Sequence, residues 1–215
     1  MERKIHKNNW QPSPAKVFWS EVAPTEHVLQ VYEDQNAFVD MLTGWAGAAI
    51  SKGNTLLIIA TPEHLNALKD RLKALAIQVN ALIKAGQFIA LDAQQTLDKF
   101  MVDGMPDPDL FNKVIGTQLL KARSLNRNVS AFGEMVAILW AQGNKQATIE
   151  LENLWNKVCA EESLSLFCAY PKSGFGNGTE DELNDICCAH SHMITTAGKP
   201  MTDLLHKATE QRRVA

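Results

Sequence analysis

Residues 55–68 read TLLIIATPEHLNAL, and this stretch decides the fold class of the chain. Its first six residues are almost all apolar and include three β-branched side chains, which is typical of a strand buried on both faces of a parallel sheet. Thr61 and Pro62 follow directly, in the order expected of a helix N-cap and the first helical residue. Leucines then recur at helical spacing. The stretch therefore predicts one strand–helix unit of an α/β domain.

The same alternation of strand and helix patterns continues on both sides of this unit. We expect further strands at 28–32, 87–92, 129–133 and 164–170, and further helices at 36–50, 79–84, 93–102, 108–125, 134–141, 145–161 and from Thr179 onward. Strands that alternate with helices predict right-handed βαβ units. The predicted fold is a three-layer αβα domain whose central sheet is mostly parallel and has at least five strands.

Length and composition fit one domain with two short appendages. Residues 1–25 contain three prolines and predict an extended arm, residues 26–195 the α/β domain itself, and residues 196–215 a helical tail. The formal net charge of −3 provides no basic face of the kind that direct nucleic-acid binding needs. Neither a secretory signal nor a membrane-spanning apolar stretch is visible, and the four cysteines show no disulfide rhythm. We expect a cytoplasmic protein with reduced thiols.

The turn after the first predicted strand argues against nucleotide binding. A phosphate-binding loop needs glycines, whose backbone amides approach the phosphate, and a lysine that offsets its charge. Residues 32–38 read YEDQNAF, with neither glycine nor lysine and with two carboxylates. The glycines at 174, 176 and 178 follow the last predicted strand instead, and we interpret them as a flexible loop. No cofactor is predicted.

Ligands of open α/β sheets bind outside the carboxyl ends of the strands. The predicted strands place there Tyr32, Glu33, His64, Asp92, Glu134 and Tyr170. Glu134 is flanked by apolar residues on both sides, which predicts a partly buried carboxylate that is paired, hydrogen-bonded or protonated. It is either a ligand-site residue or a structural carboxylate in a salt bridge or at a helix start. We expect a small pocket lined by Tyr32, Glu33, Glu134 and Tyr170. Aromatic surface beside one or two carboxylates suits a small organic ligand that is neutral or cationic.

Two cysteines and two histidines crowd the segment before the C-terminal tail. Cys187, Cys188, His190 and His192 offer only one half of the paired ligand spacing that is typical of zinc sites. We interpret them as small buried cysteines and polar histidines near a helix end, and we predict no metal site. A nucleophilic Cys–His pair stays open, without a third residue in view to orient it. No catalytic residue is assigned.

Several separated phrases occur in the order known from one family. They are EHVLQVYED (26–34), GNTLLIIATPEHLNAL (53–68), FIALDAQQTLDKFMVDGMPDP (88–108), FGEMVAILWAQGN (132–144) and FCAYPKSGF (167–175). From about His27 to about Met193 the chain resembles the MEDS domain, the methanogen/methylotroph, DcmR sensory domain. The resemblance implies a divergent relative of the KaiC and RecA-like ATPases. It adds His27 to the candidate ligand-binding residues, and it implies that the first and fourth strands are neighbours, which would bring Glu134 close to Tyr32.

The resemblance also implies a function. Family members are thought to sense small, hydrocarbon-like molecules, and many carry a histidine kinase or a DNA-binding domain beside this module. Because the flanks of this chain are too short for either, we expect output through a separate regulatory protein, such as a histidine kinase or a transcription regulator. The alternatives are an enzyme, namely a residual nucleotide hydrolase or a Cys/His-dependent hydrolase, and a scaffold with a vestigial pocket. Homo-oligomerisation stays open.

Overall fold

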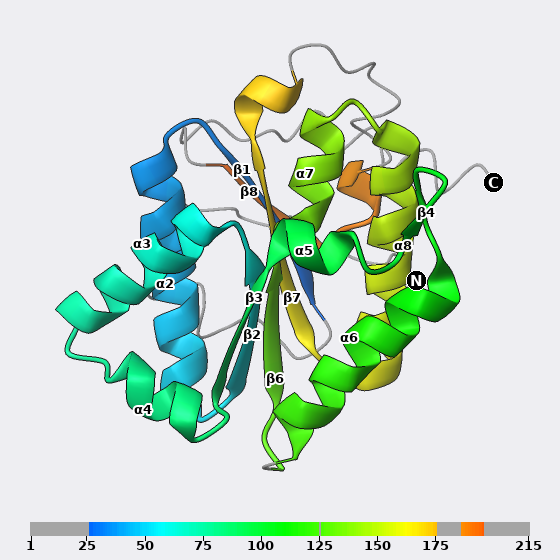
Figure 1. The fold of residues 1–215 in the computed structure, drawn as a ribbon. Coiled ribbons are helices and arrows are strands. Elements are labelled where there is room, and N and C mark those ends of the chain that lie inside the picture. Colours follow the sequence, from blue (N-terminus) through cyan, green and yellow to red (C-terminus); the bar gives the residue numbers. More distant parts are fainter. Residues whose placement is uncertain (1–25, 125, 176–185, 196–215) are drawn as a thin grey trace, which may run out of the picture.

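The stretch 55–60 forms strand β2 (Thr55–Ala60), and all six of its residues are buried. The computed structural model describes residues 26–124, 126–175 and 186–195. In it, β2 is parallel to both of its neighbours, β3 (Phe88–Asp92) and β6 (Val129–Gly133). The other strands of this sheet are β7 (Ser165–Pro171), β1 (His27–Tyr32) and β8 (His192–Thr195). The strand order is β3-β2-β6-β7-β1-β8, and every neighbouring pair is parallel (Figure 1).

Helices cover both faces of the sheet, as the alternating pattern predicts. One face carries α2 (Gln35–Ser51), α3 (Pro62–Ala74) and α4 (Val79–Lys84). The other face carries α5 (Ala93–Leu97), α6 (Pro108–Arg123), α7 (Met135–Ala141) and α8 (Lys145–Glu162) (Figure 1). Each face has its own apolar core, and the residues of β1 and β7 alternate between the two. The predicted three-layer α/β fold is confirmed.

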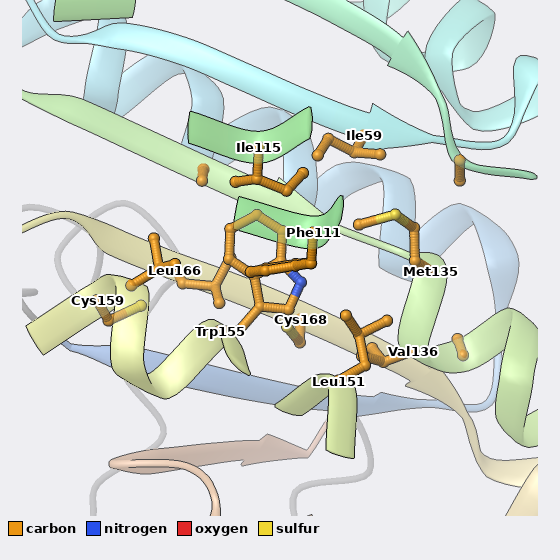
Figure 2. Packing of buried hydrophobic residues seen from close by; sticks show 14 of the residues in the cluster. Ile59, Phe111, Ile115, Met135, Val136, Leu151, Trp155, Cys159, Leu166 and Cys168 are labelled. Atoms are coloured by element: carbon orange, nitrogen blue, oxygen red, sulfur yellow. The ribbon is translucent and has the colours of Figure 1, made fainter. Parts of the chain in front are cut away.

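The larger of the two cores lies between the sheet and helices α6 to α8. The Trp155 ring of α8 meets the Phe111 ring of α6 edge to face, with centroids 5.3 Å apart (Figure 2). Leu151 lies one helical turn before Trp155 and is also buried. The helical spacing of Trp140, Leu151 and Trp155 indicates core packing, and all three are confirmed as core residues.

The helices begin where the sequence places short polar side chains. Asp34 accepts a hydrogen bond from the backbone nitrogen of Ala37, and Thr61 accepts one from that of His64. Asp92 accepts one from Gln95 in the same way. Each cap satisfies a backbone donor that the first turn of a helix leaves without an intrahelical partner.

The expected helix at 93–102 is wrong in its second half. Helix α5 ends at Leu97, and the chain then forms a two-stranded hairpin of β4 (Met101–Val102) and β5 (Met105–Pro106). Asp103 and Gly104 connect these strands with φ angles of 49° and 79°. An Asp-Gly pair with two positive φ angles is the preferred two-residue hairpin turn, so local turn chemistry outweighs the helical pattern here.

Two further expectations about the sheet need correction. The sixth strand, β8, was not expected, because its four residues form too short a segment for a periodic pattern. The first and fourth predicted strands, β1 and β6, are not neighbours, since β7 lies between them and pairs with both. The residues of β7 are buried along nearly its whole length, as expected of a strand with a neighbour on each side and helices on both faces.

Some expectations concern segments outside the described residues. They are the N-terminal arm at 1–25, the helical tail at 196–215, the start of the helix at Thr179 and the glycines at 176 and 178. Of the helices that the structure does describe, none is both long enough and apolar enough to cross a membrane.

Candidate functional site

The chain leaves β2 and β6 in opposite directions, although the two strands are neighbours. After β2 it continues into α3 on one face, and after β6 it continues into α7 on the other. Such a point in a parallel sheet is a topological switch point, where the ligands of open α/β folds bind. Thr61 and Glu134 are the first residues beyond the two strands. The sheet topology therefore selects this position as the candidate ligand site.

Glu134 is held in place by both sides of the switch point. Its side chain accepts a hydrogen bond of 2.8 Å from the backbone nitrogen of Thr61 and lies 2.6 Å from Nδ1 of His64. The residue is only 6% exposed. Its side chain makes no capping bond to its own helix. The carboxylate is therefore buried and paired, which fits both a structural salt bridge and a ligand-site residue. The carboxylate thus presents a fixed negative charge at the switch point.

His64 connects Glu134 to a polar side chain at the protein surface. Its Nε2 lies 2.8 Å from the side-chain oxygen of Gln35, which is exposed at the start of α2. Burial alone would lower the pKa of His64, but the hydrogen bond to Glu134 and the charges of Glu134 and Glu63 outweigh burial and raise the pKa above 6.5. Both ring nitrogens face oxygen acceptors, an environment that favours the imidazolium. The result is a buried ion pair with one exposed polar neighbour.

Tyr32, at the end of β1, lies on the same face as this pair. Its ring stacks on Phe38 with centroids 4.5 Å apart, and Phe38 in turn meets the His64 ring edge to face at 4.8 Å. Burial, together with the negative charge of Glu134, raises the pKa of Tyr32 to about 12. The phenol therefore stays neutral and can donate a hydrogen bond. Tyr32, His64 and Glu134 form the core of the candidate site, which we call the switch-point site together with Gln35.

The other candidate residues lie elsewhere. Glu33 is exposed and forms an ion pair with Lys172, which follows β7. Asp92 is the last residue of β3 and caps α5. Tyr170 belongs to the core on the α8 face, whereas Tyr32 belongs to the core on the α2 face. Side chains alternate along a strand, so residues of neighbouring strands can end on opposite faces. The expected grouping of Tyr170 with Tyr32 and Glu134 is therefore wrong.

His27 joins a second polar group on the α8 face. Its Nε2 lies 3.1 Å from Sγ of Cys168 and 3.4 Å from a carboxylate oxygen of Glu152. Tyr170 donates a hydrogen bond of 2.5 Å to Glu152, and His190 lies 3.5 Å from the same carboxylate. His190 thus contacts residues from distant parts of the chain, where the sequence interpretation had expected only a polar histidine near a helix end. We call this group the buried cluster.

Part of the buried cluster has the arrangement of a nucleophile with its base. His27 lies between Cys168 and Asn156, whose side-chain oxygen is 2.9 Å from Nδ1. This pair is not the one that the sequence left open, which was drawn from Cys187, Cys188, His190 and His192. Asn156 is the third residue, which could orient the base. Cys168, however, is 0% exposed. Burial, with the negative charge of Glu152, raises the pKa of its thiol well above the usual value.

Sequence reasoning assigned neither Gln35 nor Cys168 to a site, and it matched Glu152 to the family only as part of the phrase ELENLWN (150–156). Gln35 and Cys168 carry no local signal that sets them apart. Glu152 does carry one, since it shares the core-facing stripe of α8 with Thr148, Trp155 and Cys159. A carboxylate at an apolar helical position is expensive unless it is paired, and it therefore marks a polar site in a core.

Comparison with known protein families agrees with the resemblance. The family model described as MEDS, the methanogen/methylotroph, DcmR sensory domain, matches residues 26–191. Among solved structures, the chain is similar to a KaiC-like protein from the hyperthermophilic archaeon Pyrococcus horikoshii. That match has 12% sequence identity and a TM-score of 0.49, and it covers 69% of this chain and 63% of the other. No curated protein matches. Since the family model covers well over half of its 215 residues, the chain belongs to the MEDS sensory-domain family.

Proposed function

We propose that this protein is a non-catalytic sensory domain that binds a small organic molecule, neutral or cationic, at the switch-point site. Membership of a sensory-domain family supports a sensing role. The observation that carries the proposal is the carboxylate of Glu134, fixed by Thr61 and His64 where the chain leaves β2 and β6 on opposite faces. The aromatic rings of Tyr32 and Phe38 flank it.

The charge of the site limits the class of ligand. Glu134 offers acceptor oxygens, and Glu33 and Glu63 lie on the adjoining surface. The His64–Glu134 ion pair is neutral overall, so the like charge that an anionic ligand would meet comes from the exposed Glu33 and Glu63. An ammonium or hydroxyl group can still donate to the carboxylate oxygens of Glu134. The rings of Tyr32 and Phe38 are buried next to His64, so a small molecule would contact them only after displacing neighbouring side chains. Hydrocarbon-like molecules with one polar group fit this combination best.

A Cys/His-dependent hydrolase is the second candidate, and the arrangement of Cys168, His27 and Asn156 favours it. Burial weighs against it, because a nucleophilic thiol must meet its substrate and must ionise readily. Cys168 lies inside the core, and the neighbouring Glu152 carboxylate opposes thiolate formation. The sensory function is therefore the better supported of the two.

We propose that a separate regulatory protein, such as a histidine kinase or a transcription regulator, receives the signal. Ligand binding at the switch-point site would act first on Gln35, at the start of α2, and on the α3 turn that carries His64. The exposed Glu33–Lys172 ion pair joins this loop to the segment after β7. These surface loops are the part of the molecule through which a partner would detect the ligand.

Thermal-shift measurements with the full chain test the proposal. The probes are methylammonium, trimethylammonium, methanol and dichloromethane, with acetate as an anion of similar size. We expect at least one cationic or neutral probe to raise the melting temperature while acetate does not. Glu134→Gln should weaken the binding of that probe about tenfold or more, since a hydrogen bond to a charged group contributes about 1.5–3 kcal/mol.

Glu161→Gln is the matched control, because Glu161 is 60% exposed on α8 and far from the switch point in the fold. It should bind the probe as the unchanged chain does. No shift with any probe, an equal shift with acetate, or an unchanged shift in Glu134→Gln would each contradict the proposal. A cysteine-directed alkylating reagent that modifies Cys168 rapidly in the folded protein would instead favour the hydrolase.

A further inference from the structure

The buried cluster contains four potential metal ligands from four separate parts of the chain. His27 begins β1, Glu152 lies on α8, Cys168 lies in the middle of β7, and His190 precedes β8. One potential ligand atom from each residue lies within 4.8 Å of all the others. We propose that His27, Glu152, Cys168 and His190 bind a divalent transition metal ion, and that this ion is zinc.

The distances fit a tetrahedral ion. Zinc–ligand bonds of about 2.0–2.3 Å place the ligand atoms of a tetrahedron about 3.3–3.8 Å apart. Nε2 of His27 lies 3.1 Å from Sγ of Cys168 and 3.4 Å from Oε2 of Glu152. Nε2 of His190 lies 3.5 Å from Oε1 of Glu152, and Sγ of Cys168 lies 4.0 Å from Oε2. All four ligand atoms lie within 4.8 Å of one another, so side-chain shifts of up to about 1 Å would complete the coordination.

The orientation of His190 points independently to a missing ligand. Its Nδ1 lies 2.6 Å from the carbonyl oxygen of Ile186, which can only accept, so Nδ1 carries the proton and Nε2 carries a lone pair. The side chain is 1% exposed, and its Nε2 has no hydrogen-bond partner among the described residues. A buried nitrogen lone pair that faces a carboxylate is unfavourable unless a metal cation lies between them or the carboxyl group carries a proton.

The surrounding contacts are those of a metal site. Metal-binding histidines usually donate their second ring N–H to an oxygen, which fixes the tautomer. Here Nδ1 of His27 faces the side-chain oxygen of Asn156, and Nδ1 of His190 donates to Ile186. Tyr170 hydrogen-bonds the carboxylate of Glu152. The two imidazoles are therefore held with both Nε2 atoms available.

Ligand type and charge favour zinc. Two imidazoles, one thiolate and one carboxylate match its preference for nitrogen, sulfur and oxygen donors in a four-coordinate site. The Cys168 thiolate and the Glu152 carboxylate together balance the two positive charges, so the buried site would be neutral. Binding forms one zinc–sulfur bond and releases the thiol proton to solvent. Because all four coordination positions come from the protein, the site is structural in type.

The test uses the full chain without an affinity tag. After removal of metal with EDTA, zinc binding is measured by competition with a chromophoric chelator, and metal content by elemental mass spectrometry. We expect one zinc ion per chain. Asn156→Ala should weaken binding roughly 10- to 100-fold, and Cys168→Ser should weaken it further. Cobalt in place of zinc should give a thiolate charge-transfer band that Cys168→Ser removes.

Cys159→Ser is the matched control, because Cys159 is buried in the same core but is not one of the four ligands (Figure 2). It should keep the zinc affinity and the cobalt band. If Cys168→Ser does not fold, the zinc stoichiometry and the cobalt spectrum of the unchanged chain still decide whether the chain binds one metal ion through a thiolate. The absence of stoichiometric zinc in the unchanged chain, or an equal affinity in a folded Cys168→Ser variant, would overturn the proposal.

Discussion

The three histidines within the described core and site show how local contacts decide the chemistry of one residue type. His64 faces two oxygen acceptors and has a pKa above the usual 6.5. His27 and His190 lie deeper, and burial lowers their pKa to about 4. For His27 the neighbouring His190 lowers it further, and Glu152 only partly compensates. The first histidine is therefore suited to carry a charge, and the other two are suited to present lone pairs.

The charge of His64 predicts a pH dependence of stability. Its pKa is raised in the folded state, so the His64–Glu134 contact contributes fully below the unfolded pKa of about 6.5 and is lost as the pH rises through the folded pKa. His64→Gln should therefore cost roughly 1.5–3 kcal/mol at pH 6 and less at pH 9. Urea denaturation of both proteins at the two pH values measures this difference.

Nuclear magnetic resonance provides an independent check of the same prediction. The His64 ring resonance should titrate above pH 6.5 in the unchanged chain and at a lower pH in Glu134→Gln. Equal losses of stability at the two pH values, or a titration of His64 below 6.5 in the unchanged chain, would mean that Glu134 does not hold the proton on His64.

Sequence reasoning identified single residues of interest better than it predicted which residues lie together in the fold. Glu134 stood out because a carboxylate between apolar residues must be paired, and its partners are Thr61 and His64. Its location after a strand was also sufficient to select the correct edge of the sheet. The buried cluster could not be predicted, because His27, Glu152 and His190 meet only through tertiary packing. The spacing rule for zinc ligands applies to residues that are close together in the sequence, so it does not detect such a group.

At the scale of elements, local signals agree with the structure wherever a cap or a buried strand is clear. The starts of α2, α3 and α5 follow from Asp34, Thr61 and Asp92. The segment 93–106 shows the limit, since a helical pattern and an Asp-Gly turn compete there and the turn prevails. Helix patterns are most reliable over long segments, and α5 has only five residues.

Asp92 distinguishes a capping role from a ligand-binding role. Its side chain accepts a hydrogen bond of 2.8 Å from the backbone nitrogen of Gln95, and it is the last residue of β3, at the edge of the sheet. Asp92→Ala should cost about 1 kcal/mol of stability, the typical value for an N-cap. Asp92→Asn should cost little, because asparagine caps equally well. Chemical denaturation measures both. A loss of probe binding in Asp92→Asn would return Asp92 to the ligand site.

At the scale of the molecule, strand order separates two polar sites that the sequence cannot separate. Because β7 lies between β6 and β1, its side chains alternate between the two cores, and Tyr170 faces away from Tyr32. The switch-point site therefore lies on the α2 face at the carboxyl edge of the sheet, and the buried cluster lies on the α8 face beneath α8. The layers follow from the pattern of strands and helices, whereas the strand order is set by long-range pairing.

The turn between β1 and α2 argues against nucleotide binding. In a nucleotide-binding α/β domain, the turn after a strand presents free backbone amides and a cation to the phosphates at a helix N-terminus. Here the turn from β1 into α2 contains no lysine or glycine. Asp34 already accepts the hydrogen bond of Ala37, and the exposed Glu33 lies beside it. A triphosphate would have to displace one carboxylate and approach another.

We therefore expect magnesium-ATP and magnesium-GTP to give no saturable heat in calorimetry at sub-millimolar concentrations. A double change of Glu33→Gln and Asp34→Asn removes the repulsion and keeps the cap. It should still bind no nucleotide, because the turn would still lack the glycines and the lysine that hold a phosphate. Micromolar binding to the unchanged chain that is lost on changes at 33–37 would show that this turn binds phosphate by another arrangement. Binding that appears only in the double variant would show that charge alone excludes the nucleotide.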